Sequence, residues 1–102
     1  RLLGLSLNDI QQLAQDIIAN NLMALMKAFT PKGMTKALAV QSQTGGAEDA
    51  TSYELDERGD NVVHITFRAP DGDGTIVTHW VEKGGSWKVD DMQSIEAAAG
   101  EA

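Results

Sequence analysis

The spacing of apolar residues changes once along this chain of 102 residues, close to Ala39, and that change limits the folds open to it. Before Ala39, apolar residues recur every three or four positions, which is typical of a helix with one buried face. After it, apolar and polar residues alternate, which is typical of strands with one buried face. Helices followed by strands predict an α+β domain, in which N-terminal helices pack on a bent antiparallel sheet of three to four strands.

The apolar stripe of the first part predicts one helix over Leu7–Phe29. Ser6 and Asp9 have the spacing of a capping box, with Asp in place of the usual Glu, and Asn8 with Gln11 is a competing start signal one turn or less further on. Thr30 and the proline after it predict the start of a second helix, because Thr accepts hydrogen bonds from the first free N–H groups and Pro lacks one of them. This second helix is expected to cover about Pro31–Leu38, since few apolar residues support it.

The second part of the chain contains four segments predicted as strands, separated by turns rich in Gly, Asp and Asn. They are Thr51–Leu55, Val62–Ala69, Thr75–Lys83 and Ser86–Ile95. The alternation in the last strand slips after Val89, which predicts a β-bulge at Asp90–Asp91. The polar segment Gln41–Glu48, with Gly45 and Gly46, is predicted as the turn into the sheet, and Glu96–Ala102 as a tail. Residues 1–102 are expected to form a single domain.

Charge and hydropathy exclude several classes of partner. The formal net charge is −7, and no cluster of Lys and Arg exists that could neutralise phosphates, so no nucleic-acid partner is predicted. No apolar run is long enough to span a bilayer, so no transmembrane segment is predicted either. The chain begins at Arg1, which favours an exported, processed protein (periplasmic, secreted or a lipoprotein domain) over a cytoplasmic one, although a trimmed chain fits equally.

Two patterns partly resemble metal sites, and neither predicts one. Asp71 to Glu82 matches several ligand positions of a calcium loop, but Ile76 stands where that loop needs Gly, so a plain hairpin is expected. His64 and His79 lie on neighbouring predicted strands. A hairpin symmetric about residue 72 places them on opposite faces, whereas a register changed by one residue brings them together. Two histidines without a third ligand make a poor metal site, and no metal or cofactor is predicted.

Asp90 and Asp91 are the strongest candidates for chemistry, because a bulge redirects a side chain and bulges are frequent near functional sites. A carboxylate turned into an apolar cavity acts as a base when burial raises its pKa. Tyr53, His64 or His79 would then polarise a substrate. The alternative is that one carboxylate caps the bulge and the other meets water.

The segment Trp80–Met92 reads W-V-E-K-G-G-S-W-K-V-D-D-M: a strand ending in Glu-Lys, a Gly turn, then Trp-Lys-Val-Asp. It resembles the closing hairpin of the nuclear-transport-factor-like (cystatin-like) superfamily, whose helices come first and wrap a strongly bent, cone-like sheet. The resemblance covers Leu7–Ile95 by element order and this hairpin by motif. Members of that superfamily include isomerases and cyclases with a carboxylate base, lipid carriers and interaction modules.

The resemblance and the patterns together favour a non-enzymatic binding module, which holds a small apolar ligand or a protein partner on its concave sheet. Methionine-rich segments adapt to irregular apolar ligands. The expected walls are Leu22, Met26, Phe29, Met34, Phe67, Trp80 and Trp87. Two alternatives stay open: a small isomerase or lyase with an Asp base in the cone, and a homodimer in which the open face of the sheet pairs with a copy of itself.

Overall fold

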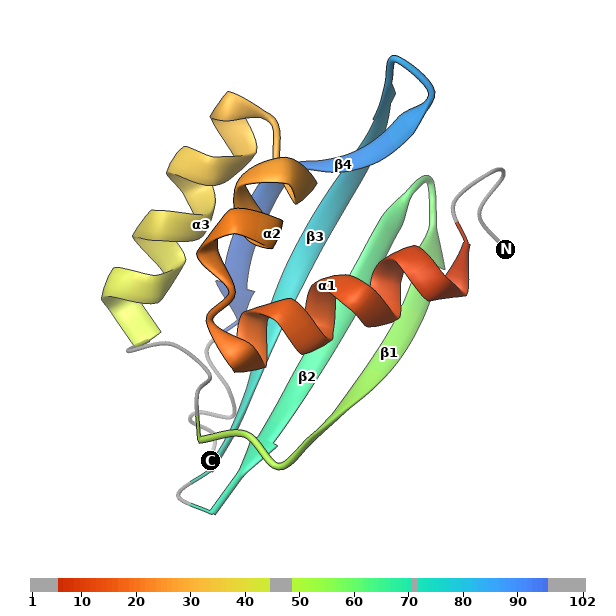
Figure 1. The fold of residues 1–102 in the computed structure, drawn as a ribbon. Helices are drawn as coiled ribbons and strands as arrows, with labels where there is room; N and C mark the ends of the chain where they lie inside the picture. Colours follow the sequence, from red (N-terminus) through yellow and green to blue (C-terminus); the bar gives the residue numbers. More distant parts are fainter. Residues whose placement is uncertain (1–5, 45–48, 71, 96–102) are drawn as a thin grey trace.

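Three helices precede a four-stranded antiparallel sheet and pack on one of its faces (Figure 1). The computed structural model describes residues 6–44, 49–70 and 72–95. The predicted turn at Gly45 and Gly46 and the predicted tail Glu96–Ala102 lie outside the described residues. The elements are α1 Leu7–Ala19, α2 Leu22–Ala28, α3 Pro31–Thr44, β1 Ser52–Gly59, β2 Val62–Ala69, β3 Gly72–Lys83 and β4 Ser86–Ile95. This arrangement confirms the α+β class.

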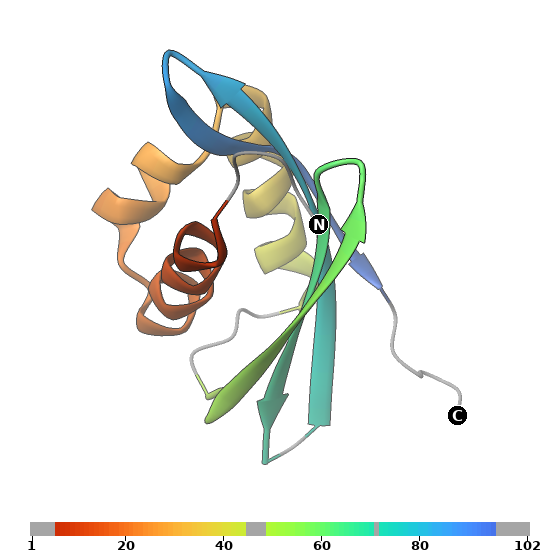
Figure 2. The same cartoon turned by 90° about the vertical axis from the view of Figure 1, so that its right-hand side faces the viewer.

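The sheet is open, and its strands lie in sequence order, β1-β2-β3-β4. Viewed from its edge, it is twisted, the helices occupy one side, and the hairpin between β3 and β4 bends toward them (Figure 2). No helix among the described residues is long and apolar enough to cross a membrane.

The predicted single helix Leu7–Phe29 is wrong, because the chain breaks it at Asn20. Asn20 takes the left-handed conformation (φ 54°, ψ 43°), which Asn tolerates better than most residues, and its N–H donates to the carbonyls of Asp16 and Ile17. The side chain of Asn21 then accepts from the N–H of Ala24 at 3.3 Å and begins α2. At the start of α1, the Ser6 hydroxyl accepts from the Asp9 N–H at 3.2 Å, as predicted.

The third helix starts where predicted and runs further than predicted. The Thr30 hydroxyl accepts from the N–H of Gly33 at 3.0 Å, and the helix begins at Pro31. It continues past Leu38 to Thr44, because Val40 gives it another buried contact and no Gly or Pro interrupts the segment.

The sheet confirms β2 and β4 at their predicted bounds, whereas β1 and β3 are longer than predicted. The β2–β3 pairing extends to Ala69 and Gly72 and sets His64 opposite Val77 and Val62 opposite His79. The symmetric register about residue 72 is therefore wrong, because Ala69 already pairs with Gly72, and the two histidines share one face of the sheet. The register shift on β4 lies between the partners of His79 and Trp80 and leaves Asp90 as the extra residue, which confirms the bulge.

The core lies between the helices and one face of the sheet. Val63, Ile65 and Phe67 of β2 point into it in alternation, as predicted. Ile10 and Leu13 of α1 meet them from the other side. The opposite face of the sheet carries the two histidines, and none of the three described helices covers it (Figure 2). The histidines therefore lie on the other side of the sheet from the core.

A close junction joins α3 to the bulge of β4. The N–H of Thr30 donates to the carbonyl of Val89 at 3.0 Å. The first turn of α3 lies so near this strand that a Cβ added at Gly33 would overlap the Val89 carbonyl oxygen and lie 3.2 Å from the Cα of Asp90. Glycine is therefore the residue that this junction accommodates.

Candidate functional site

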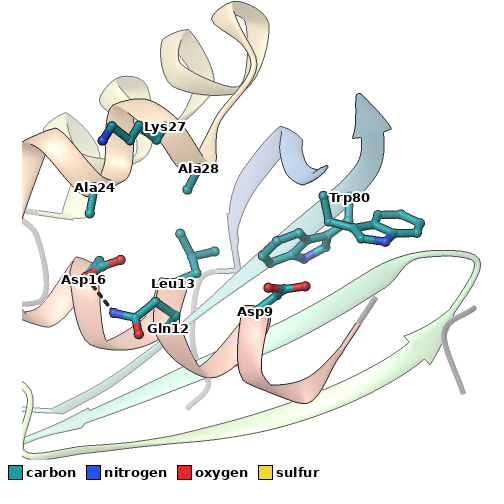
Figure 3. A pocket seen from close by; sticks show the side chains of 9 residues that line it. Asp9, Gln12, Leu13, Asp16, Ala24, Lys27, Ala28 and Trp80 are labelled. Atoms are coloured by element: carbon teal, nitrogen blue, oxygen red, sulfur yellow. Dashed lines mark hydrogen bonds between the residues drawn. The ribbon is translucent and has the colours of Figure 1, made fainter. Parts of the chain in front are cut away.

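A cleft of about 270 Å³ opens between α1, α2 and the indoles of the β3–β4 hairpin (Figure 3). Its volume lies at the lower end of the range for small-molecule sites. The lining side chains come from two helices and two strands, and they are Asp9, Gln12, Leu13, Asp16, Ala24, Lys27, Ala28, Trp80 and Trp87.

The wall from α1 is a stripe with helical spacing. Asp9, Gln12, Leu13 and Asp16 follow the i, i+3, i+4, i+7 pattern and so point to one side. Asp16 is only 8% exposed, and its Oδ1 accepts from the Gln12 amide at 3.1 Å. This wall therefore contains an apolar side chain between two carboxylates, one buried and one exposed.

The aromatic wall is held rigidly by the sheet. Trp80 is 3% exposed, and its indole N–H donates to the Thr78 hydroxyl at 2.8 Å. That hydroxyl donates in turn to the carbonyl of Val63 at 2.8 Å. Because its N–H is already bonded, Trp80 offers a ligand only the surface of its ring. Trp87 is half-buried and packs against the same core.

The wall from α2 is made of Ala24, Lys27 and Ala28. With 100° of rotation per residue, the side of this helix away from the cleft carries Leu22 and Met26. They are 57% and 67% exposed, and Met23 between them is 73% exposed. Apart from Lys27, helix α2 thus lines the cleft with alanines, and it presents Leu22, Met23 and Met26 to solvent.

The predicted wall residues fall into three groups. Trp80 and Trp87 line the cleft, whereas Leu22 and Met26 are exposed on α2. The remaining three lie in or against the core: Phe29, Met34 and Phe67. Sequence reasoning missed the α1 wall, because Asp9, Gln12 and Asp16 lie on the polar side of the predicted helix and such a side is usually solvated. The i, i+3, i+4, i+7 spacing that these residues share with Leu13 was the sequence signal that could have identified this wall.

The two bulge carboxylates are engaged at the junction with α3. Asp90 accepts from the Thr30 hydroxyl at 2.8 Å and lies 3.6 Å from the Lys32 ammonium. The hydrogen bond from Thr30, followed by the charge of Lys32, lowers the pKa of Asp90 despite partial desolvation. Asp91 accepts from the Met92 N–H at 2.9 Å and lies 3.9 Å from Lys36. A lowered pKa makes Asp90 a weaker base.

The structure does not gather the catalytic candidates into one site. Tyr53 lies on β1, at the opposite edge of the sheet from β4, and its hydroxyl accepts from the Gln15 amide at 3.3 Å. Three strand spacings separate those edges, roughly 14 Å. His64 lies on the uncovered face, opposite Asp56, and His79 lies opposite Asp91 on that face. Within residues 6–44, 49–70 and 72–95, no three His, Asp or Glu side chains form a ligand set for a metal.

Comparison with known proteins gives no relative: the chain matches no protein-family model, no curated protein and no solved structure.

Proposed function

We propose that this chain is a non-enzymatic binding module of the nuclear-transport-factor-like kind, and that it holds a small ligand with an apolar body in the cleft between α1 and α2. The observation that carries the proposal is the aromatic wall. Trp80 and Trp87 line a cleft whose other apolar walls are Leu13, Ala24 and Ala28. A few apolar and aromatic walls with a small number of polar groups are typical of small-molecule sites.

Binding is favoured over catalysis because the two carboxylates that the sequence singled out as bases, Asp90 and Asp91, are engaged at the junction with α3. Asp90 is bonded to Thr30 and paired with Lys32, and neither it nor Asp91 lines the cleft. Catalysis normally needs several convergent groups, and the candidates lie on different strands and faces.

Native mass spectrometry before and after organic extraction tests the proposal. A bound ligand appears as a mass adduct that extraction removes. The same cleft is tested directly by titration with n-octanol, followed by tryptophan emission, because both tryptophans of the chain line it.

A filling variant and its matched control make this test specific. Ala24→Met places a longer side chain in the cleft and is expected to weaken octanol binding several-fold. Ala39→Met makes the same change at an exposed position of α3 and is expected to leave binding unchanged. Absence of any adduct together with no response to octanol would show that the cleft is not a ligand site.

A second candidate is supported by the exposed side chains of α2. Leu22, Met23 and Met26 form an apolar patch of a kind that marks protein interfaces, and a partner protein or a second copy would cover it. Light scattering over a concentration series measures self-association. Met23→Lys is expected to abolish a dimer formed through α2, whereas Val77→Lys is expected to abolish one formed through the uncovered face of the sheet.

A further inference from the structure

The buried polar side chains of the described residues differ in how completely they are bonded. They are Asp16, Thr30 and Thr78. Each threonine hydroxyl both donates and accepts a hydrogen bond. Asp16 accepts one hydrogen bond from a neutral amide, that of Gln12. A buried carboxylate is normally paired with a cation, so the bonding of Asp16 is incomplete.

The described groups around Asp16 do not supply that cation. Across the described parts of the chain, the ion pairs within 4.0 Å involve other carboxylates, those of Glu54, Asp56, Asp73, Asp90 and Asp91. Among the described residues, the charged side chains that line the cleft are two carboxylates, Asp9 and Asp16, and one ammonium, that of Lys27. These described side chains give the cleft a net charge of −1, and the hydrogen bond drawn to its buried carboxylate comes from the neutral Gln12 amide (Figure 3).

We propose that the cleft binds an aliphatic ammonium, whose charged head pairs with Asp16 and whose chain lies along the apolar walls toward the indoles. The proposal rests on the function proposed above and names its ligand class. The head would satisfy the carboxylate by a charge-assisted hydrogen bond. Leu13, Ala24 and Ala28 offer apolar surface for the chain, and the indole faces of Trp80 and Trp87 also attract cations.

The dimensions of the cleft suit such a ligand. Asp9 and Asp16 are seven residues apart on α1, which corresponds to roughly 10 Å along the helix axis. An alkyl chain of medium length covers that distance, and a volume of about 270 Å³ holds it without room for a folded macromolecule. An anionic ligand of the same length would meet a cleft of like net charge.

Three probes with the same alkyl chain test the charge preference: n-octylammonium, n-octanol and n-octanoate, each titrated while tryptophan emission is recorded. The expected order of affinity is ammonium, then alcohol, then carboxylate, with the ammonium about tenfold tighter than the alcohol. Asp16→Asn keeps the size of the side chain and its bond with Gln12. It is expected to remove most of that tenfold preference, which is measured for each protein as the ratio of its ammonium and octanol affinities.

Asp9→Asn is the matched control, because it removes one negative charge from the same cleft at an exposed position. It is expected to change the preference less than twofold at 0.15 M salt, since exposed charges are screened. Circular dichroism checks that each variant is folded. Equal binding of ammonium and alcohol by the unmodified protein, or equal effects of the two variants, would overturn the ammonium proposal and leave the cleft as an apolar site. No response to any probe would overturn both proposals.

Discussion

Helix propensity and the packing of α3 predict opposite effects of Gly33→Ala on the stability of the protein. Helix propensity alone predicts that Gly33→Ala stabilises the protein by about 1 kcal/mol. The structure predicts the opposite sign. The new Cβ would lie 2.8 Å from the carbonyl carbon of Val89, closer still to its oxygen, and both are backbone atoms of a paired strand that cannot rotate away.

The size of the expected loss of stability follows from how far α3 must move away from β4. Ordinary contact begins near 3.4 Å, and the Val89 oxygen is the nearest atom, so the first turn of α3 must retreat from the bulge by more than an ångström. Overpacking of this kind costs about 1–3 kcal/mol, and weakening of the hydrogen bond from Thr30 to Val89 costs about 1 kcal/mol more. After the gain in propensity, the expected net loss is about 2 kcal/mol, which lowers the melting temperature by about 8–16 °C in a domain of this size.

Urea unfolding followed by circular dichroism measures this loss as a free energy of unfolding. Thr35→Ala is the control, because it raises propensity at an exposed position of the same helix and is expected to change stability by about 0.5 kcal/mol or less. If Gly33→Ala proves as stable as the unmodified protein, α3 does not approach β4 as closely as described, and the reasoning fails.

Two further variants test the aromatic wall and the bulge. Thr78→Val leaves the buried indole N–H of Trp80 without its acceptor and is expected to cost about 1–3 kcal/mol in urea unfolding, with a changed tryptophan emission; unchanged stability would contradict this bond. Asp90→Asn removes a carboxylate whose pKa Thr30 and Lys32 hold below its ordinary value of about 3.9. Because a lowered pKa stabilises the fold above that ordinary value, the variant is expected to be less stable at neutral pH, and its deficit should shrink as the pH falls through the lowered pKa. A deficit that is constant down to pH 2 would exclude this linkage.

The fold class could be predicted because local patterns agree with the tertiary structure. Alternation identified Val63, Ile65 and Phe67 as core residues, and Thr30 marked a helix start that the structure places where expected. The break at Asn20 was missed, because the apolar stripe continues across it. Asn adopts the left-handed conformation more readily than most residues, and the spacing of apolar residues contains no information about that backbone preference.

The cleft could not be predicted, since it depends on that missed break. One continuous helix would leave Asp9 and Asp16 facing solvent, as their position on the polar side indicates. The turn at Asn20 brings α2 back over α1, so that Ala24 and Ala28 close over the same side. The sequence identifies the residues on the surface of each helix, but it does not show that these two surfaces face each other in the folded protein.

The order of the strands has a consequence for the rate at which the molecule assembles and comes apart. Each strand pairs with its neighbour in the chain, across turns as short as that from Lys83 to Ser86. The bond from Thr30 to Val89 instead joins residues 59 positions apart. Closing that loop costs more chain entropy than closing a hairpin, so docking of α3 is expected late in folding. Contacts that form after the transition state slow unfolding without changing the folding rate. A substitution that weakens the contact between α3 and β4 is therefore expected to speed unfolding and to leave the folding rate nearly unchanged.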